Sequence, residues 1–441
     1  MRFYNVQKVL SDQFSVTNLQ ILNISKLFYK AMLQGLNDEF GSLKMLPSYM
    51  NKPTRQEKGE YLTIDFGGTN LRIEVMELLG NGAYKIGKSL SIPLDNRKSG
   101  SNFTSERSTA TDLFGFIACQ IRELAEPHKK YFLGHTFSFP TKQTGPNSAT
   151  LLKWTKELKT SGVEGQDINV LLSEALKANG IHNVFPKVII NDTVGTLLTA
   201  AYKSPHANIG SICGTGHNTC YFEPSPPTSN TPMIINIESG NFNKLQFNKY
   251  DDLLDRKSEK PGEQRLEKMV GGKYLGELVR LIVLDFVDNG ILLCKCNKKL
   301  QKEIITSCSI TSKDVAEIQS DNTFQLEIIN YFINSRFHYS DSLLEDRKIL
   351  KITADLIIKR AAKLIASTYL GILDKIDPNL KSKQIISLDG SLYGNIPLFQ
   401  KYIRKSLDDA LGEKSGSVIV ELIKDGSGVG AAIAAAMFKY L

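Results

Sequence analysis

The chain has 441 residues, of which 41% are hydrophobic and 23% charged, and its formal net charge is +8. This length allows one to three domains with a large core, and the composition is ordinary for a globular protein. The positive charge is spread along the chain without a Lys/Arg block. This pattern argues against a nucleic-acid partner and suits an anionic substrate such as a nucleotide.

The cysteines and the apolar runs indicate a compartment. Six cysteines fit no disulfide framework for a chain of this size. Cys294-Lys295-Cys296 lacks the second cysteine pair or nearby histidines that a zinc site needs. Reduced thiols are usual in the cytoplasm. No apolar run reaches membrane-spanning length, and the N-terminus lacks a signal-peptide core. We therefore expect a cytoplasmic protein without a membrane segment.

Hydrophobic periodicity predicts alternating strands and helices in the first half of the chain. The expected strands are 61–66, 71–79, 84–92, 132–139 and 184–190. The expected helices are 16–36, 113–126, 167–179 and 193–203. Polar residues 95–108 are expected to form a loop, residues 145–148 a turn, and residues 151–155 a short extended run. The segment before residue 16 is assigned no role.

The second half repeats this pattern. Its expected strands are 209–213, 219–223, 233–237, 384–388 and 418–422. Its expected helices are 266–289, 348–376, 397–411 and 431–440. The order strand-strand-strand-helix-strand-helix-strand occurs in both halves, which indicates an α/β fold with helices covering the sheets. From this duplication we infer that a nucleotide binds between two similar halves.

A glycine turn follows the central strand of the first half. The apolar run Tyr61–Phe66 contains one carboxylate, Asp65, and ends at Gly67-Gly68 and Thr69-Asn70. Glycines let backbone amides approach a phosphate closely. A strand follows the turn, and no G-K-[ST] is present, so neither a Walker loop nor a dinucleotide fingerprint fits. A plain hairpin is the alternative, but a second turn at Gly214–Gly216 favours phosphate binding.

Polar residues collect where the predicted strands end. In open α/β sheets, ligands bind beyond the carboxyl ends of the strands. Asp192 taken alone is better explained as a helix N-cap. Taken together, the set favours a nucleotide site; its members are Asp65, Ser138, Asn191, Asp192, Gly214–Asn218, Glu238, Gly390 and Ser391.

Several runs in one order resemble the eukaryotic hexokinase family, which includes fungal glucokinases. They include L-T-I-D-F-G-G-T-N-L-R (62–72), L-G-H-T-F-S-F-P (133–140), W-T-K (154–156), I-I-N-D-T-V-G-T-L (189–197), G-T-G-H-N (214–218), I-N-I-E-S-G (235–240), D-G-S-L-Y (389–393) and D-G-S-G-V-G-A-A (425–432). The resemblance implies a two-domain actin-like ATPase fold, which is ribonuclease H-like, with a deep interdomain cleft. The implied small domain is 57–192 plus 428–441, and the implied large domain is 1–56 plus 193–427.

The resemblance also implies a reaction, in which a hexose receives the γ-phosphate of ATP on its 6-hydroxyl. Asp192 would be the base, and Lys156 would be the second catalytic residue. The implied sugar ligands are Ser138, Thr155, Lys156, Asn191, Asp192, Asn218, Glu238 and Glu267. The implied nucleotide ligands are Asp65, Gly67, Gly68, Thr69, Asn70, Thr215, Gly272, Gly390 and Ser391. Asp65 would hold Mg²⁺ through water, and the acting unit would be a monomer or homodimer.

Some positions near the implied sugar pocket depart from the family pattern. The family usually has Phe at His135, Gly-Phe at Glu157-Leu158, a small or apolar residue at His217 and Trp at Ser239; a lysine usual near Ser89 is shifted to Lys88. Trp to Ser would leave a void unless neighbours refill it. Two alternatives therefore stay open. One is a hexokinase-like sugar sensor or regulator with low or no activity, and the other is an N-acetylglucosamine kinase.

Overall fold

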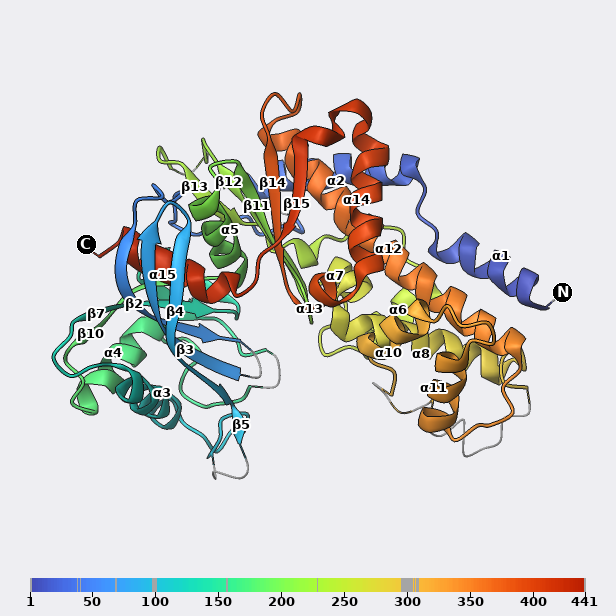
Figure 1. Cartoon of the computed structure of the whole chain (residues 1–441), viewed down its shortest axis with the longest axis horizontal. Helices are drawn as coiled ribbons and strands as arrows, with labels where there is room; N and C mark the ends of the chain where they lie inside the picture. Colours follow the sequence, from blue (N-terminus) through green and yellow to red (C-terminus); the bar gives the residue numbers. More distant parts are fainter. Residues whose placement is uncertain are drawn as a thin grey trace.

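Two β-sheets covered by helices divide the molecule into two lobes (Figure 1). The computed structural model describes residues 2–37, 39, 41–67, 70–96, 101–155, 158–227, 229–294, 304, 306 and 309–439. Three hydrophobic clusters form the core, one in each lobe and one around two helices between the sheets. The α/β class predicted from the sequence is confirmed.

The first lobe is built on a five-stranded sheet with the order β10-β7-β2-β3-β4. The first three strands along the chain form an antiparallel meander, and the last two run parallel to β2. The strands are β2 (Lys58–Phe66), β3 (Asn70–Gly80), β4 (Ala83–Pro93), β7 (Tyr131–Phe137) and β10 (Val184–Ile190). Helices α3 (Ala110–Leu124) and α4 (Ile168–Ala178) cover one face of this sheet.

Strand parity decides which way the functional side chains of this sheet face. Successive residues of a strand point to opposite sides. Leu62 and Ile64 pack in the cluster with α3 and α4, whereas Tyr61 packs in the cluster between the sheets. Asp65 shares the parity of Tyr61, so its carboxylate faces the middle of the molecule.

The second lobe repeats the strand order of the first. Its sheet has the order β1-β13-β12-β11-β14-β15, in which β11, β12 and β13 are antiparallel and β14 and β15 run parallel to β11. The strands are β1 (Leu46–Pro47), β11 (Ala207–Cys213), β12 (His217–Glu223), β13 (Met233–Asn236), β14 (Gln384–Asp389) and β15 (Val418–Leu422). Apart from the added β1, both sheets follow one topology, which confirms the duplication.

Helices α5 (Asp192–Lys203) and α15 (Gly426–Met437) pack against each other between the two sheets. Their crossing is very close, because a Cβ on Gly430 would lie 2.2 Å from the carbonyl oxygen of Gly195. Helix α15 also lies on the first sheet, where a Cβ on Gly134 would lie 2.0 Å from the carbonyl oxygen of Ala431. In Figure 1 the red α15 lies among the blue strands of the first lobe, although it comes last in the chain.

The 33-residue helix α12 (Leu344–Ile376) organises the second lobe. Helices α1 (Arg2–Phe14), α2 (Asn18–Leu36) and α14 (Pro397–Leu411) pack against it. Helix α1 was not predicted. It buries Val6, Leu10 and Phe14, and it is tied to α12 by a hydrogen bond of 2.9 Å from Arg2 Nη2 to Asp346 Oδ1.

Other sequence predictions need correction. The single helix predicted at 266–289 is divided into α7 (Arg265–Val270) and α8 (Gly272–Asp288), because Gly271 between them is extended, with φ −73° and ψ 141°. Of the run predicted as extended at 151–155, only Leu151 belongs to a strand, because the small hairpin of β8 (Thr141–Gly145) and β9 (Ser148–Leu151) ends there and residues 152–155 have no regular secondary structure. The structure also contains elements that were not predicted: β5 (Asp95–Asn96), β6 (Ser101–Asn102), α6 (Lys249–Lys257), α10 (Ser312–Ser320), α11 (Glu327–Phe337) and α13 (Ser391–Asn395).

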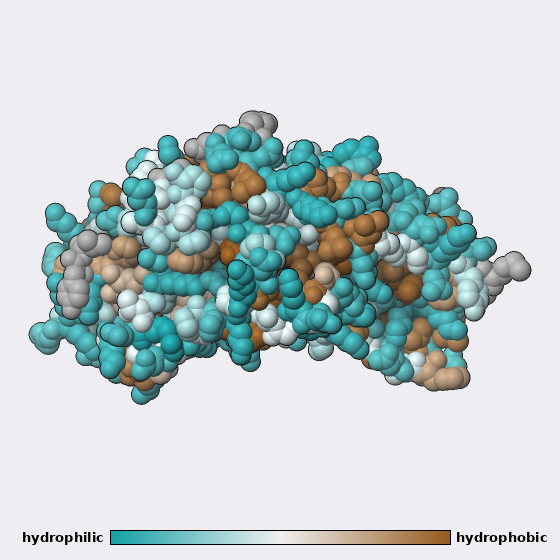
Figure 2. All heavy atoms as spheres, turned by 90° about the horizontal axis from the view of Figure 1, so that it is seen from above, coloured by the Kyte–Doolittle hydropathy of each residue, from teal (hydrophilic) through white to brown (hydrophobic). Residues whose placement is uncertain are grey.

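The surface is mostly hydrophilic on the face drawn in Figure 2, with hydrophobic side chains in separate patches. Across the part of the chain that the structure describes, no helix has the length and apolarity needed to cross a bilayer.

Candidate active site

Three glycine-containing segments of the second lobe meet at the ends of its strands. The turn between β11 and β12 contains Thr215. The amide of Gly272 donates to the carbonyl oxygen of Gly214 at 2.8 Å, and the amide of Lys273 donates to that of Thr215 at 2.9 Å. Gly390, with φ +112°, approaches so closely that a Cβ would lie 2.6 Å from the carbonyl oxygen of Cys213. The structure therefore brings Thr215, Gly272 and Gly390 together.

A cavity of about 920 Å³ adjoins these segments. Its wall includes Thr215, Gly272 and Ser391 together with apolar side chains of Ile310 and Leu398. Backbone groups of glycine turns on one side and apolar side chains on the other suit a ligand with a phosphate end and a flat apolar end.

The turn of the first lobe lies between β2 and β3. Asp65 is near the end of β2, Gly67 follows that strand, and Asn70 begins β3 at an exposed position. The predicted phosphate ligands Gly68 and Thr69 lie outside the described residues. The strand after this turn confirms that the segment is neither a Walker loop nor a dinucleotide fingerprint.

One half-buried carboxylate, that of Asp389, helps to connect the two turns. Asp389 Oδ1 accepts from the amide of Gly390 at 2.6 Å, and its Oδ2 accepts from the amide of Gly426 at 3.0 Å. The next residue, Ser427, donates from Oγ to Asp65 Oδ2 at 2.6 Å. Burial raises the pKa of Asp389 against the effect of the two amides, and the charges of Asp425 and Asp192 add to the rise. The two glycine turns thus belong to one site.

Asn191 and Asp192 start helix α5 and face this junction. Asn191, not Asp192, is the N-cap, because its Oδ1 accepts from the Thr193 amide at 2.9 Å. This corrects the interpretation of Asp192 as the cap. Asp192 is the first helical residue, its Oδ1 accepts from the same amide at 2.9 Å, and its side chain is only partly buried.

Amides and a carboxylate are linked on the second lobe. Asn218 Nδ2 donates to Asn236 Oδ1 at 2.9 Å and approaches Glu238 Oε1 at 3.4 Å. Asn236 Nδ2 donates to Glu238 Oε1 at 2.9 Å. Glu238 has φ +57°, a conformation that is uncommon for a residue with a side chain and is often found at functional sites. Sequence reasoning missed Asn236, although an amide two residues before Glu238 in an apolar strand was a usable signal.

Glu267 connects helix α7 to the start of strand β12 in the second lobe. Its Oε2 accepts from the amide of His217, next to the turn that carries Thr215, at 3.0 Å. A Cβ at Gly216 would lie 2.4 Å from the same Oε2, so the Glu267 carboxylate would have to move to make room for a side chain there. Glu267 therefore contacts the turn between β11 and β12.

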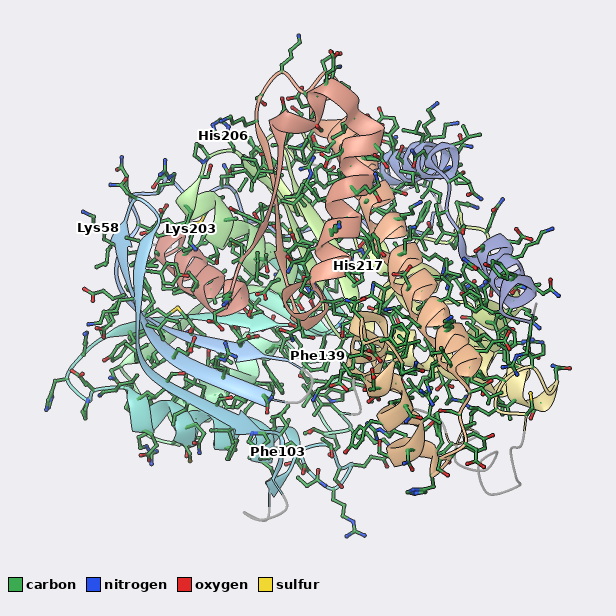
Figure 3. All side chains as sticks on the ribbon, turned by 45° about the vertical axis from the view of Figure 1, so that its right-hand side comes forward. Lys58, Phe103, Phe139, Lys203, His206 and His217 are labelled. Atoms are coloured by element: carbon green, nitrogen blue, oxygen red, sulfur yellow. The ribbon has the colours of Figure 1, made fainter. Side chains whose placement is uncertain are left out.

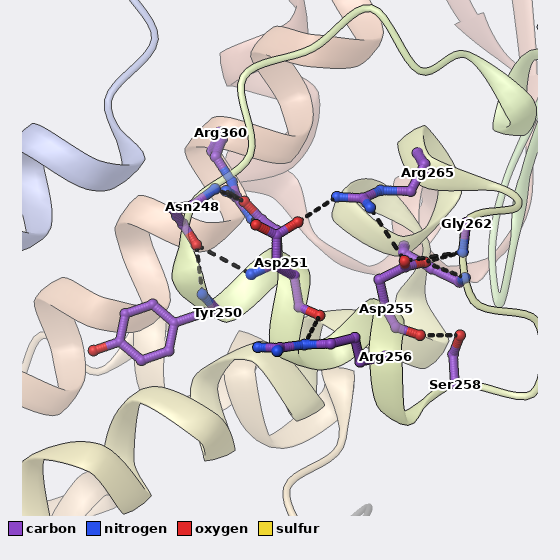
Figure 4. Close-up of polar contacts among 11 residues, drawn as sticks. Asn248, Tyr250, Asp251, Asp255, Arg256, Ser258, Gly262, Arg265 and Arg360 are labelled. Carbon is purple, nitrogen blue, oxygen red and sulfur yellow. Dashed lines mark hydrogen bonds and ion pairs between the residues drawn. The ribbon is translucent and has the colours of Figure 1, made fainter.

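A network of ion pairs holds α7, the short helix that carries Glu267 (Figure 4). Arg265 Nη1 contacts Asp255 Oδ2 at 3.1 Å, and Lys268 Nζ contacts Asp255 Oδ1 at 2.6 Å. Burial opposes the charged form of Asp255, but the bonds from Lys268 and Gly262 outweigh burial and lower its pKa. Arg360 of α12 grips the neighbouring Asp251 through two bonds of 2.9 and 2.8 Å. Breaking such a buried pair costs about 3–5 kcal/mol, so this network fixes the helix firmly.

The first lobe supplies Ser138 and Thr155 beside an aromatic cluster. The rings of Phe66, Phe139 and Trp154 lie within 6.2 Å of one another, centroid to centroid. Both polar residues are half-buried neighbours of these rings in the sequence. Figure 3 labels Phe139 and Lys58 at opposite ends of the first sheet, so the cluster lies at the end where β2 and β7 finish. Lys156 lies outside the described residues, as does Glu157.

A second cavity, of about 360 Å³, opens between the lobes. Phe139 and Asn191 line it from the first lobe, and Asn236 and Glu238 line it from the second. The predicted sugar ligands Asn191 and Glu238 thus share one cavity, and Asn218 reaches it through its bonds to Asn236 and Glu238. Ser138 and Thr155 lie beside this cavity without lining it.

Polar side chains surround the position where the family pattern has Trp. Ser239 is fully buried, and its Oγ donates to Thr219 Oγ1 at 3.2 Å. Thr219 Oγ1 lies 3.2 Å from Ser211 Oγ, which accepts from the hydroxyl of Tyr369 on α12 at 2.9 Å. A chain of hydroxyl groups therefore connects Ser239 to Tyr369 on α12.

Two buried histidines among the departures are neutral. Burial lowers the pKa of His135 to about 3, although the Asn169 carboxamide beside it acts in the opposite direction. Neither ring nitrogen of His135 has a well-aligned hydrogen bond among the described residues. Burial also lowers the pKa of His217 to about 4, against the bond between its Nδ1 and the carbonyl oxygen of Ile212.

His135→Phe should therefore reduce the loss of stability in acid. Below pH 6.5 the unfolded chain protonates this histidine and the folded chain does not, so the stability present above pH 6.5 declines as the pH falls towards 3. Between pH 7 and 5 the decline attributable to His135 is about 2 kcal/mol. We expect the variant to lose that much less, as measured by urea unfolding at both pH values. His206→Gln, at an exposed position, is the control and should follow the wild type.

Two lobes of one topology, a glycine turn from each and a polar cavity between them define a phosphotransferase with the actin-like ATPase fold. Two family models, both described as hexokinase, match residues 6–202 and 208–437. Hexokinase-7 of Oryza sativa subsp. japonica is 36% identical, over 93% of this chain and 92% of that protein. Hexokinase-1 of Schizosaccharomyces pombe is 34% identical, over 97% of this chain and 90% of that protein. The solved structure of hexokinase from Schistosoma mansoni complexed with glucose matches with a TM-score of 0.86 and 31% identity, and 99% of each chain is covered.

The chain belongs to the hexokinase family. It is a hexokinase-type phosphotransferase, an ATP-dependent hexose kinase. The alternatives of a sugar sensor and of an N-acetylglucosamine kinase are not favoured by these relatives.

Proposed function

We propose that this kinase phosphorylates the 6-hydroxyl of a glucose-like hexose bound in the cavity between the lobes. The observation that carries the proposal is the arrangement around helix α5. Asn191 lines the polar cavity, Asp192 follows it, and Asp389 joins the region to the nucleotide turns. Sugar and phosphate would then meet at the start of one helix.

Asp192 is proposed as the base. Its carboxylate would accept the proton of the 6-hydroxyl as the phosphoryl group arrives, and Asn191 would orient the sugar. Lys156 is proposed as the cation beside the transferred group.

The sugar hydroxyls are proposed to be held by several polar side chains at once. Losing a buried hydrogen-bond partner costs about 1–3 kcal/mol, so such a set can discriminate between epimers. We add Asn236 to the set inferred from the sequence. The full set is Ser138, Thr155, Lys156, Asn191, Asp192, Asn218, Asn236, Glu238 and Glu267.

Mg²⁺ is proposed to arrive with ATP. Within the described ranges, no group of three or more His, Cys, Asp or Glu side chains could hold a metal by itself. Mg²⁺ bound to nucleotide phosphates and water needs only one or two protein carboxylates, and Asp65 beside the first glycine turn fits this demand. We propose that Asp65 holds the ion through water. The ion would neutralise charge on the phosphates.

The nucleotide is proposed to span both turns. Its phosphates would contact Gly67, Gly68, Thr69, Asn70 and Thr215, and its adenosine would lie in the cavity near Gly272, Gly390 and Ser391. The apolar lining of that cavity supports this orientation.

We propose a small domain of 57–192 plus 428–441 and a large domain of 1–56 plus 193–427. The packing of α15 on the first sheet supports assigning the C-terminal segment to the small domain. Closure of the two domains around the sugar would exclude water and limit ATP hydrolysis. Each chain has residues from both sides of the cavity, so a monomer or a homodimer could act. The free thiols of Cys119, Cys213, Cys220 and Cys294 support a cytoplasmic location.

A coupled assay tests the proposed substrate class. Glucose, fructose, mannose and N-acetylglucosamine are each offered with ATP and Mg²⁺. We expect phosphorylation of glucose, with the N-acetyl sugar the poorest substrate. Absence of turnover on all four at high enzyme concentration, with glucose still raising the melting temperature, would overturn the proposal in favour of a sensor.

A further inference from the structure

Ser427 lies in the first turn of helix α15, and hydrogen bonds from several elements hold this turn in place. Its carbonyl oxygen accepts from Thr136 Oγ1 of β7 at 2.8 Å. The preceding residue, Gly426, donates its amide to Asp389 and accepts at its carbonyl from Thr199 Oγ1 of α5 at 2.8 Å. A salt bridge of 2.6 Å from Arg72 Nη1 to Asp425 Oδ1 closes the turn on its remaining side. Strands of both sheets and helix α5 therefore fix the backbone of Ser427.

The hydroxyl of this fixed residue contacts the carboxylate of Asp65 directly. The distance from Ser427 Oγ to Asp65 Oδ2 is 2.6 Å, in the range of charge-assisted hydrogen bonds. Arg72 lies close enough to Asp65 for an electrostatic interaction, but its guanidinium donates its hydrogen bond to Asp425. Outer partners of this kind orient carboxylates that serve a metal ion.

We propose that Ser427 is a positioning residue, whose hydroxyl orients the Asp65 carboxylate for the Mg²⁺ that ATP carries. Through Gly426 and Asp389, the same turn connects that carboxylate to Gly390 on the opposite side of the nucleotide. These hydrogen bonds would hold the two ends of the proposed nucleotide site in a fixed position relative to each other. The inference rests on the proposed role of Asp65.

Calorimetric titration with ATP, without sugar, tests the inference. Each protein is titrated once with Mg²⁺ and once with EDTA, and the ratio of the two Kd values measures the gain due to the metal. We expect Ser427→Ala to reduce this gain about tenfold and to leave the Kd in EDTA unchanged. Ser427→Thr keeps the hydroxyl and should restore the gain.

Thr199→Val is the matched control, because it loosens the same turn at the Gly426 carbonyl without touching Asp65. It should keep the full gain, and loss of the gain in this variant would overturn the proposal. An undiminished gain in Ser427→Ala would overturn it as well. Asp65→Asn distinguishes the role of Ser427 from that of Asp65. If Asp65→Asn abolishes the gain due to the metal while Ser427→Ala does not, only the proposed role of Ser427 fails. If Asp65→Asn keeps the gain, the proposed role of Asp65 fails and the inference falls with it.

Discussion

Replacing Asp192 with asparagine is expected to lower kcat about a thousandfold while hexose binding changes little. A positioned general base contributes about 10²–10⁴ to a rate, and an amide cannot take the proton. Asparagine keeps the size of the side chain and an Oδ1 that can accept from the Thr193 amide, and Asn191 still caps α5. The measurement is steady-state kinetics with hexose and ATP varied, together with the rise in melting temperature that glucose produces.

Asp167→Asn supplies the control for this variant. Asp167 caps α4 in the same lobe, where its Oδ1 accepts from the amides of Asn169 and Val170. The same chemical change is thus made at a helix start away from the cavity. It should leave kcat unchanged. If Asp192→Asn retains kcat within tenfold of the wild type, Asp192 is not the base.

Gly430→Ala is expected to lower the free energy of unfolding by at least about 3 kcal/mol and to abolish activity. The added Cβ would lie 2.2 Å from the Gly195 carbonyl oxygen and 2.3 Å from its Cα. These are backbone atoms of the facing helix, so no side-chain rotation can relieve the clash, and overpacking of a tight core costs about 1–3 kcal/mol or more. The helices would have to separate, and α5 would carry Asp192 out of position. Thermal melting and the coupled assay measure the two effects.

Gly115→Ala makes the same change in α3, where a Cβ would meet nothing within 4 Å. Alanine is favoured over glycine inside a helix by about 0.5–1 kcal/mol. This control should therefore be slightly more stable than the wild type and fully active. Similar melting temperatures for the two variants would contradict the close helix crossing.

The elements that could be predicted were those with strong local patterns. Apolar runs marked the central strands, and the repeated order of strands indicated two similar sheets. Helices α1, α6 and α10 were missed because they are mostly polar and gain stability from packing on other elements. Helix α11 was missed because its apolar residues are not gathered on one face. Capping boxes at Asn248 and Thr311 were available signals for two of them.

Residues of the candidate site could be predicted where a polar residue follows or ends a predicted strand. They could not be predicted where their role depends on contacts between segments far apart in the sequence. Asp65, Asn191 and Glu238 could be found in this way. The link through Asp389 and Ser427 could not, because the hydrogen bond between Ser427 and Asp65 spans 362 positions of sequence. The chain of hydroxyl groups that begins at Ser239 ends at Tyr369, and no local sequence pattern connects these two residues.

The placement of α15 has a consequence for biosynthesis. The first sheet is synthesised before the second, but the helix that covers its inner face follows the last strand of the second sheet in the sequence. Until residue 437 is available, Tyr61, Val188 and Ile190 lack the α15 part of their cluster. The nascent first lobe should therefore expose a hydrophobic face until α15 has been synthesised, and an arrest of translation shortly before α15 should leave it aggregation-prone.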